Sequence, residues 1–148
     1  MRKDLSSAAN TSNWNDRFRE EKGKVRVNYK KIVITGGCGF LGQFIVKQLL
    51  ETGNCPLLRV VDLKANGAAL FDFADDKNVE IVLGADVCDY YSMVDEFAGA
   101  DCVIHLAGVV SFSLKDELLL RSVNAGGTGN VLRAAATTTS RPSFMSVQ

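Results

Sequence analysis

A glycine-rich segment between an apolar run and an amphipathic stretch constrains the fold of this chain more than any other feature. Residues 31–35, KIVIT, form a β-branched run that is typical of a buried strand. Gly36, Gly39 and Gly42 follow it at G-x-x-G-x-x-G spacing. Residues 41–49 then carry large apolar side chains at helical spacing. The pattern predicts a strand, a tight turn and a helix in immediate succession.

The three glycines have separate expected uses. Gly36 permits the tight turn, Gly39 lets the backbone approach a pyrophosphate, and Gly42 lets helix and strand pack closely. The N–H groups at the helix start, which begins with Phe40 and Leu41, then face the phosphates and are helped by the helix dipole. Glycines at this spacing also form ordinary turns, so it is the placement between strand and helix that favours dinucleotide binding.

Strand and helix patterns alternate along the rest of the chain. Further strands are expected at 58–62, 79–83, 102–107 and 143–147, and further helices at 90–97 and 118–136. Alternation implies parallel strands joined by right-handed crossovers. The predicted fold is therefore α/β, a doubly wound, Rossmann-like parallel sheet that is truncated after about its fifth strand. Such sheets bind ligands where the strand order reverses, here the end of the first strand.

The amino-terminal residues differ from the rest. Residues 1–31 hold nine basic and four acidic side chains, whereas the remainder holds eight and thirteen, so the formal net charge is zero. We expect a polar, flexible extension over 1–28 and one Rossmann-type domain over 29–148. A basic head that touches RNA or a membrane surface is the alternative, but it lacks a tight run of basic residues. Nucleic acid is not an expected partner. With no secretory or membrane-spanning segment, a cytoplasmic location is expected.

The spacing of the cysteines argues against a metal centre. Cys38, Cys55, Cys88 and Cys102 are 17, 33 and 14 positions apart, without a C-x-x-C pair and with a single histidine in the chain. We expect reduced thiols and no metal site. His105 is flanked by apolar residues in a strand, which favours a core histidine over a catalytic base.

An acidic residue at the end of the second strand bears on the choice of cofactor. Asp62 follows Gly42 by twenty residues, where a carboxylate accepts the adenosine ribose hydroxyls and repels a 2′-phosphate. NAD is therefore favoured over NADP. Lys64 leaves NADP as an alternative, and a helix-capping or solvated aspartate is the competing interpretation of Asp62.

Five stretches together resemble the NAD-binding part of an extended short-chain dehydrogenase/reductase, closest to the 3β-hydroxysteroid dehydrogenase branch. They are TGGCGFLGQ at 35–43, LRVVDL at 58–63, GADVCD at 84–89, DCVIHLAG at 101–108 and VNAGGTGNVLRAA at 123–135. The resemblance covers about residues 30–140. It implies an NAD-dependent oxidoreductase that interconverts a 3β-hydroxyl and a ketone on a steroid or sterol by hydride transfer. A complete family member would bind that substrate, and peripheral membrane association is its alternative location.

The resemblance also implies roles for single residues. Asp86 and Val87 would contact the adenine ring, the segment 106–108 would line the cofactor, and Asn124 would support a catalytic proton relay. A turn residue at Asp86 and a buried strand end at 106–108 are the alternatives. The candidate cofactor-binding residues are Gly36, Gly39, Phe40, Leu41, Gly42, Asp62, Leu63, Asp86, Val87, Leu106, Ala107 and Gly108.

Three glycines in the last predicted helix call for an explanation. Gly126, Gly127 and Gly129 each weaken a helix by about 1 kcal/mol relative to alanine. Glycines that weaken an element are tolerated where another group needs the space. We therefore expect the cofactor or a neighbouring backbone to approach that face closely.

The catalytic pair that the resemblance requires is missing. The family uses a tyrosine with a lysine four residues later, because a nearby ammonium lowers the tyrosine pKa, and a serine that orients the substrate. None of the three tyrosines, Tyr29, Tyr90 and Tyr91, has such a lysine, and no catalytic serine is assigned. The chain alone is therefore expected to be inactive. A non-catalytic nucleotide-binding module and a truncated interaction protein are the alternatives, and an exposed sheet edge predicts self-association.

Overall fold

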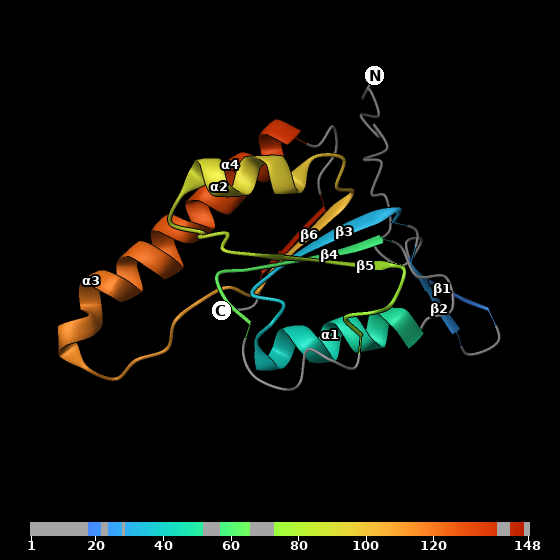
Figure 1. Cartoon of the computed structure of the whole chain (residues 1–148), viewed down its shortest axis with the longest axis horizontal. Coiled ribbons are helices and arrows are strands. Elements are labelled where there is room, and N and C mark those ends of the chain that lie inside the picture. The colour runs from blue at the N-terminus through green and yellow to red at the C-terminus, as the bar shows by residue number, and fades with distance from the viewer. Residues whose placement is uncertain are drawn as a thin grey trace, which may run out of the picture.

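Five parallel strands form one sheet in the order β5-β4-β3-β6-β7 (Figure 1). This computed structural model describes residues 18–21, 24–27, 29–51, 57–65, 73–138 and 143–146. The predicted α/β, Rossmann-like sheet is confirmed. Its strands are β3 (Lys31–Thr35), β4 (Leu57–Asp62), β5 (Val79–Leu83), β6 (Cys102–His105) and β7 (Ser143–Ser146).

The helices lie between these strands, close to where the sequence predicts them. They are α1 (Phe40–Glu51), α2 (Tyr90–Val94), α3 (Glu117–Leu120) and α4 (Thr128–Thr138). One 3-10 turn, Asp95–Phe97, follows α2, and another, Leu114–Asp116, precedes α3. The prediction of one regular helix over 118–136 is wrong, because the π-helical segment Arg121–Gly127 separates α3 from α4. Only the polar and glycine-rich composition of that segment hints at the irregularity.

Apolar side chains on both faces of the sheet hold the helices against it. Helix α1 covers one face, and α2 and α4 cover the other (Figure 1). Successive residues of a strand point to opposite faces, so Ile32 and Ile34 of β3 join one core while Val33 joins the other. Val46 of α1 completes the first core, and Val131 of α4 the second. Near-continuous apolar strands are what a sheet buried on both faces requires.

The order of the strands places a crossover at the carboxyl end of β3. This strand pairs with β4 on one side and β6 on the other, and Thr35 lies in register with both Val61 and His105. The Leu106 N–H donates to the Thr35 carbonyl at 2.9 Å. The chain then leaves the sheet, so β6 ends two residues before the predicted end at Ala107. The point at which strand order reverses is where ligands bind in such sheets.

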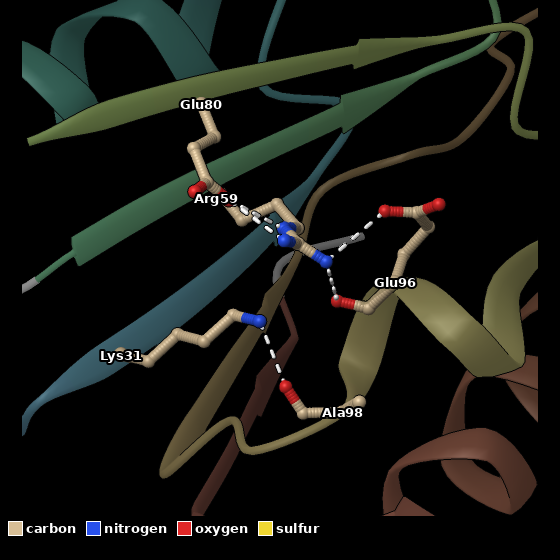
Figure 2. Close-up of polar contacts among 5 residues, drawn as sticks. All are labelled: Lys31, Arg59, Glu80, Glu96 and Ala98. Carbon is tan, nitrogen blue, oxygen red and sulfur yellow. Dashed lines mark hydrogen bonds and ion pairs between the residues drawn. The ribbon is translucent and has the colours of Figure 1, made fainter.

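A polar cluster joins the sheet to the turn after α2, toward the amino ends of the strands (Figure 2). Arg59 of β4 contacts Glu80 of β5, with Nη2 and Oε2 2.7 Å apart, and its Nη1 lies 3.3 Å from Glu96 Oε2. The Lys31 ammonium donates to the Ala98 carbonyl at 2.7 Å. Burial, followed by the nearby Arg59 charge, lowers the pKa of Lys31. The cluster is structural and lies away from the crossover.

The amino-terminal part adds a feature that the sequence did not predict. Strands β1 (Phe18–Glu21) and β2 (Lys24–Val27) form a separate antiparallel pair within the expected extension. Residues 1–17, Cys55 and the end of the chain at 147–148 lie outside the described residues. In the part of the chain that the structure describes, no helix has the length and apolar character needed to span a membrane.

Candidate functional site

A cleft of about 410 Å³ lies at the carboxyl edge of β3, β4 and β6, at the crossover. Its wall is mainly apolar, with one carboxylate contributed by β4 and another by the turn after β5. The cleft brings together most of the residues predicted to bind a cofactor. Those that line it are Gly36, Gly39, Asp62, Leu63, Asp86, Val87, Leu106, Ala107 and Gly108.

Gly36 makes the turn out of β3, and its geometry excludes other residues. Its φ of +69° lies in the left-handed region that side chains disfavour. A Cβ there would lie 2.5 Å from the Ala107 nitrogen. The Gly36 N–H donates to the Val61 carbonyl at 2.8 Å. The first glycine therefore brings the turn against both neighbouring strands, as the sequence indicates.

The other two glycines of the motif differ in their surroundings. A Cβ on Gly39 would contact only the Gly36 carbonyl oxygen, at 3.1 Å, and Gly39 lines the cleft. A Cβ on Gly42 would lie 2.5 Å from the Gly37 Cα, and Gly42 is buried outside the cleft. Gly42 therefore serves packing of α1 against the turn, and its direct contact with a cofactor stays a prediction.

Two predicted contacts at the start of α1 also lie outside the cleft. Phe40 is 82% exposed, and its ring packs edge-on against Phe44 with centroids 5.0 Å apart. Leu41 is also exposed. Their side chains do not line the cleft, so what they offer a ligand is the N–H groups of the first helical turn, which have no partner within a helix.

Asp62 ties the end of β4 to the glycine-rich turn. Its Oδ2 accepts the Cys38 N–H at 3.0 Å. The Gln43 side chain donates to the Cys38 carbonyl at 2.8 Å, a contact that the sequence did not predict. Burial, and then the charge of Asp62, raises the pKa of the Cys38 thiol to about 11. The carboxylate is thus close to the turn while still facing the cleft.

Asp86 is both a turn residue and part of the cleft, so the two interpretations of it are compatible. Its Oδ1 accepts the Cys88 N–H at 2.8 Å, and its own N–H donates to the Ser92 hydroxyl at 3.1 Å. The Asn130 amide donates to the Val87 and Cys88 carbonyls at 3.0 and 3.1 Å. Asn130 therefore fixes this loop from α4, a role that no sequence signal indicated.

Only one of the three helical glycines has a close neighbour. A Cβ on Gly127 would lie 2.7 Å from the Val87 side chain. A Cβ on Gly126 would meet only the Arg121 carbonyl at 3.8 Å, and one on Gly129 would meet nothing within 4 Å. Close approach is therefore observed only at Gly127, from a side chain and not from the expected neighbouring backbone, and approach of a cofactor to this face stays a prediction.

Asn124 lies in the π-helical segment and holds the segment after β6. Its Oδ1 accepts the Val109 N–H at 2.8 Å, and its Nδ2 donates to the Val109 carbonyl at 2.9 Å. The side chain does not line the cleft, although Val109 does. In this structure Asn124 orders the cleft wall, and its predicted part in a proton relay stays a prediction.

His105 is fully buried and hydrogen-bonded, in agreement with the interpretation as a core histidine. Its Nδ1 lies 2.6 Å from the Thr35 hydroxyl and its Nε2 lies 3.0 Å from the Thr128 hydroxyl. Burial lowers the pKa of the imidazole, because desolvation penalises the charged form.

Sequence reasoning did not place several residues in the cleft wall. Most of them are apolar. Adjacency to a strand end could have indicated some of them, but no sequence signal indicated those on helical segments, and Lys64 is noted above only for its charge. They are Thr35, Val61, Lys64, Ala85, Cys88, Met93, Val109, Leu119 and Val123. Among the described residues, no three histidine, cysteine or carboxylate side chains gather into a group that could hold a metal ion.

Comparison with known proteins gives concordant matches. The 3-beta hydroxysteroid dehydrogenase/isomerase family matches residues 33–141. The chain is 35% identical over 111 residues to 3 beta-hydroxysteroid dehydrogenase type 7 of Rattus norvegicus, covering 74% of this chain and 32% of that protein. It is 35% identical over 103 residues to the decarboxylating sterol-4-alpha-carboxylate 3-dehydrogenase of Bos taurus, covering 70% of this chain and 26% of that protein. The matches thus span about a quarter to a third of these relatives' length.

A solved structure supports the fold. The crystal structure of a uronate dehydrogenase from Agrobacterium tumefaciens, complexed with NAD, is similar with a TM-score of 0.61 and 25% sequence identity. The similarity covers 78% of this chain and 40% of that one.

Proposed function

This chain belongs to the 3-beta hydroxysteroid dehydrogenase/isomerase family, and we propose that its cleft binds NAD. The observation that carries the proposal is the meeting of the glycine-rich turn and the Asp62 carboxylate at the crossover of the sheet. A dinucleotide needs a close backbone approach for its pyrophosphate and a carboxylate for its adenosine ribose. The cleft offers both, and the NAD complex of the similar uronate dehydrogenase adds support.

The residues present fit such a cofactor from one end of the cleft to the other. Gly39 and the first turn of α1 would face the pyrophosphate, Asp62 the adenosine ribose, and Asp86 with Val87 the adenine ring. The segment 106–109 would line the nicotinamide half. When bound, NAD would supply hydride transfer, and the protein would supply binding and orientation.

The preference for NAD over NADP follows from charge. A carboxylate that accepts ribose hydroxyls repels a 2′-phosphate at the same position. Lys64 also lines the cleft and is the group that would attract a phosphate, so NADP is the alternative. Asp62 lies at the strand end where the ribose is bound in such folds, which favours NAD.

For a complete protein of this kind, we propose interconversion of a 3β-hydroxyl and a ketone on a steroid or sterol. The names of the mammalian relatives support this substrate class. The 148 residues themselves contain no tyrosine with a lysine four positions later. General acid and base groups contribute about 10²–10⁴-fold to rate, so these residues alone are expected to bind the cofactor without turnover. A non-catalytic nucleotide-binding module is the second candidate function.

Calorimetric titration with NAD and NADP tests the proposal. The unaltered chain should bind NAD more tightly. Asp62→Ala should narrow the preference, since hydrogen bonds to a charged group contribute about 1.5–3 kcal/mol each. Because Asp62 also accepts the Cys38 N–H, Asp62→Asn is the matched control: it keeps an acceptor for the turn but removes the charge. It should lose discrimination while retaining the fold, and an unchanged NAD/NADP ratio would place the ribose elsewhere.

A second variant tests the pyrophosphate position. Gly39→Val adds side-chain atoms to the cleft beside the turn and should abolish dinucleotide binding with circular dichroism unchanged. Gly129→Ala is the control, because a Cβ there meets open space, and it should bind NAD normally. Retained affinity in Gly39→Val would contradict the proposal. In the same preparations, NADH formation from a 3β-hydroxysteroid should not exceed the Gly39→Val background.

A further inference from the structure

Four residues form a hydrogen-bonded series that joins the glycine-rich turn to the π-helical segment. The hydroxyl of Thr35, the last residue of β3, lies 2.6 Å from His105 Nδ1. On the other side of the ring, His105 Nε2 lies 3.0 Å from the Thr128 hydroxyl. The Thr128 hydroxyl donates to the Asn124 carbonyl at 2.6 Å. The series therefore crosses from the sheet to the helix layer through a fully buried imidazole.

One set of hydrogen-bond directions is consistent with the Thr128 donation to the Asn124 carbonyl. A hydroxyl has one proton, and that of Thr128 is directed at the Asn124 carbonyl. We therefore assign the contact between Thr128 and His105 to a donation from Nε2–H, an assignment that the ¹⁵N measurement below tests. In the neutral imidazole Nδ1 is consequently an acceptor, and the Thr35 hydroxyl donates to it. Burial disfavours the charged ring, which agrees with the neutral form.

The two end residues of the series, Thr35 and Asn124, also contact the same piece of cleft wall, through the Thr35 backbone carbonyl and the Asn124 side chain. The Thr35 carbonyl accepts the Leu106 N–H at 2.9 Å, and the Asn124 side chain holds both the N–H and the carbonyl of Val109. Leu106 directly follows His105 in the chain. The segment 106–109, which lines the cleft, is thus fixed at its first residue by β3 and at its last by the π-helical segment.

We propose that His105, as the neutral Nε2–H tautomer, is a positioning residue that sets the segment 106–109 for cofactor binding. It does so by fixing the distance between the end of β3 and the π-helical segment that carries Asn124. His105 does not line the cleft and would not touch the cofactor. The proposal rests on the proposed function, because the segment that it positions is the one assigned to the nicotinamide half.

Substitutions at Thr128 break the series without changing the imidazole. Thr128→Val keeps the side-chain shape but removes the hydroxyl, and Thr128→Ser restores it. Losing one such bond, worth about 1 kcal/mol, should weaken NAD binding about five- to tenfold because the wall must be ordered on binding. Thr128→Ser should bind like the unaltered chain. Leu58→Ala, a core substitution in β4 away from the cleft, is the control for general destabilisation and should leave the affinity unchanged.

A spectroscopic measurement tests the series without any ligand. The chain contains one histidine, so the ¹⁵N shifts of its imidazole nitrogens report the tautomer directly. The expected result is a protonated Nε2 and an unprotonated Nδ1. In Thr128→Val, amide hydrogen exchange at Val109 should accelerate more than in Leu58→Ala. If His105 only filled volume in the core, neither the tautomer of its imidazole nor the exchange of the Val109 amide would respond to the loss of the Thr128 hydroxyl.

The outcomes separate this inference from the proposed function. An Nδ1–H tautomer, or equal Val109 exchange in Thr128→Val and Leu58→Ala, would overturn the positioning role. Unchanged NAD affinity in Thr128→Val, alongside tight binding by the unaltered chain, would overturn it as well. If the unaltered chain binds no NAD, the proposed function fails, and the tautomer and exchange measurements still decide whether His105 positions the segment.

Discussion

Cys38 is the non-glycine residue inside the glycine-rich turn, and its thiol shows how tightly this turn is packed. The side chain is fully buried, and burial with the Asp62 charge raises its pKa to about 11. The thiolate, which is the reactive form, is therefore scarce at neutral pH. Cys88, by contrast, is exposed at the rim of the same cleft.

The two thiols should therefore differ in reactivity. With iodoacetamide at pH 8, Cys88 should be alkylated rapidly, while Cys38 stays unmodified until the protein unfolds, because its thiol is both protonated and inaccessible. Peptide mass spectrometry of the native chain measures both sites, and labelling in urea is the control in which the two should react alike. Native labelling of Cys38 at the rate of Cys88 would show that the turn is open.

His105 makes a prediction about pH dependence. Burial lowers its folded-state pKa below the ordinary 6.5, so between these two values the unfolded chain binds more protons. Its contribution to stability is present above pH 6.5 and is lost as pH falls through the folded-state pKa. Urea unfolding between pH 7.5 and 5 should show this loss, and His105→Gln, which does not titrate, should show a smaller slope. If the free energy of unfolding depended equally on pH in the unaltered chain and in His105→Gln, the lowered pKa of His105 would be contradicted.

At the scale of elements, the predicted strands and helices follow from local sequence. KIVIT at 31–35 forms β3 because β-branched residues suit a sheet that is buried on both faces, and the glycines after it end the strand. The same signals located β4, β5 and β7 to within one residue at each end. The cleft residues at strand ends could also be predicted, because parallel strands bring their carboxyl ends to one edge.

What could not be predicted depends on contacts between distant segments. The π-helical segment is held by Asn124 through Val109, fifteen residues earlier, and no helical periodicity encodes that bond. Asn130 reaches the loop after β5 over more than forty residues. The strands β1 and β2 are only four residues long, so the alternation of KVRV at 24–27 is too short to predict the pair from the sequence.

Gly127 tests the contact between the π-helical segment and the loop after β5. In Gly127→Ala the new Cβ would lie 2.7 Å from the Val87 side chain, and such overpacking costs about 1–3 kcal/mol. The helix-propensity gain of about 1 kcal/mol offsets part of this cost, so we expect a net destabilisation of up to about 2 kcal/mol. Gly129→Ala, whose Cβ meets open space, should instead be neutral or stabilising. Urea denaturation measures both.

A double-mutant cycle identifies the cause. Val87→Ala removes the methyl group nearest to the new Cβ, so in that background Gly127→Ala should cost less, with a coupling energy of about 0.5–3 kcal/mol. Additive effects of the two substitutions would mean that the glycine is needed for backbone conformation and not for the Val87 contact.

In the molecule as a whole, the ion pairs that stabilise the sheet and the cleft lie at opposite ends of the parallel strands. The polar cluster around Arg59 lies toward the amino ends of the strands. There it joins β4 and β5 to the turn after α2 (Figure 2). The carboxyl ends border the cleft. Polar groups at one end can therefore stabilise the fold without occupying the space that a cofactor needs at the other.

The same architecture leaves surfaces on which copies of the chain can associate. Among the described residues, β5 and β7 are the outer strands of the sheet, and unpaired strand edges are templates for pairing. Phe112 is 99% exposed, and Val110, Leu114 and Leu118 near it are also exposed. With a formal net charge of zero, electrostatic repulsion between copies is weak.

The purified 148-residue chain should therefore self-associate, and light scattering at tens of micromolar, about the range where exposed apolar surface promotes aggregation, measures it. Met145→Lys places a charge on β7 and should reduce association if the strand edge drives it, whereas Phe112→Ser should reduce it if the apolar segment does. Tyr91→Ser, at an exposed aromatic on α2, is the control and should change nothing. A monodisperse monomer would contradict the prediction, because neither the open edges nor the apolar segment would then recruit a second copy.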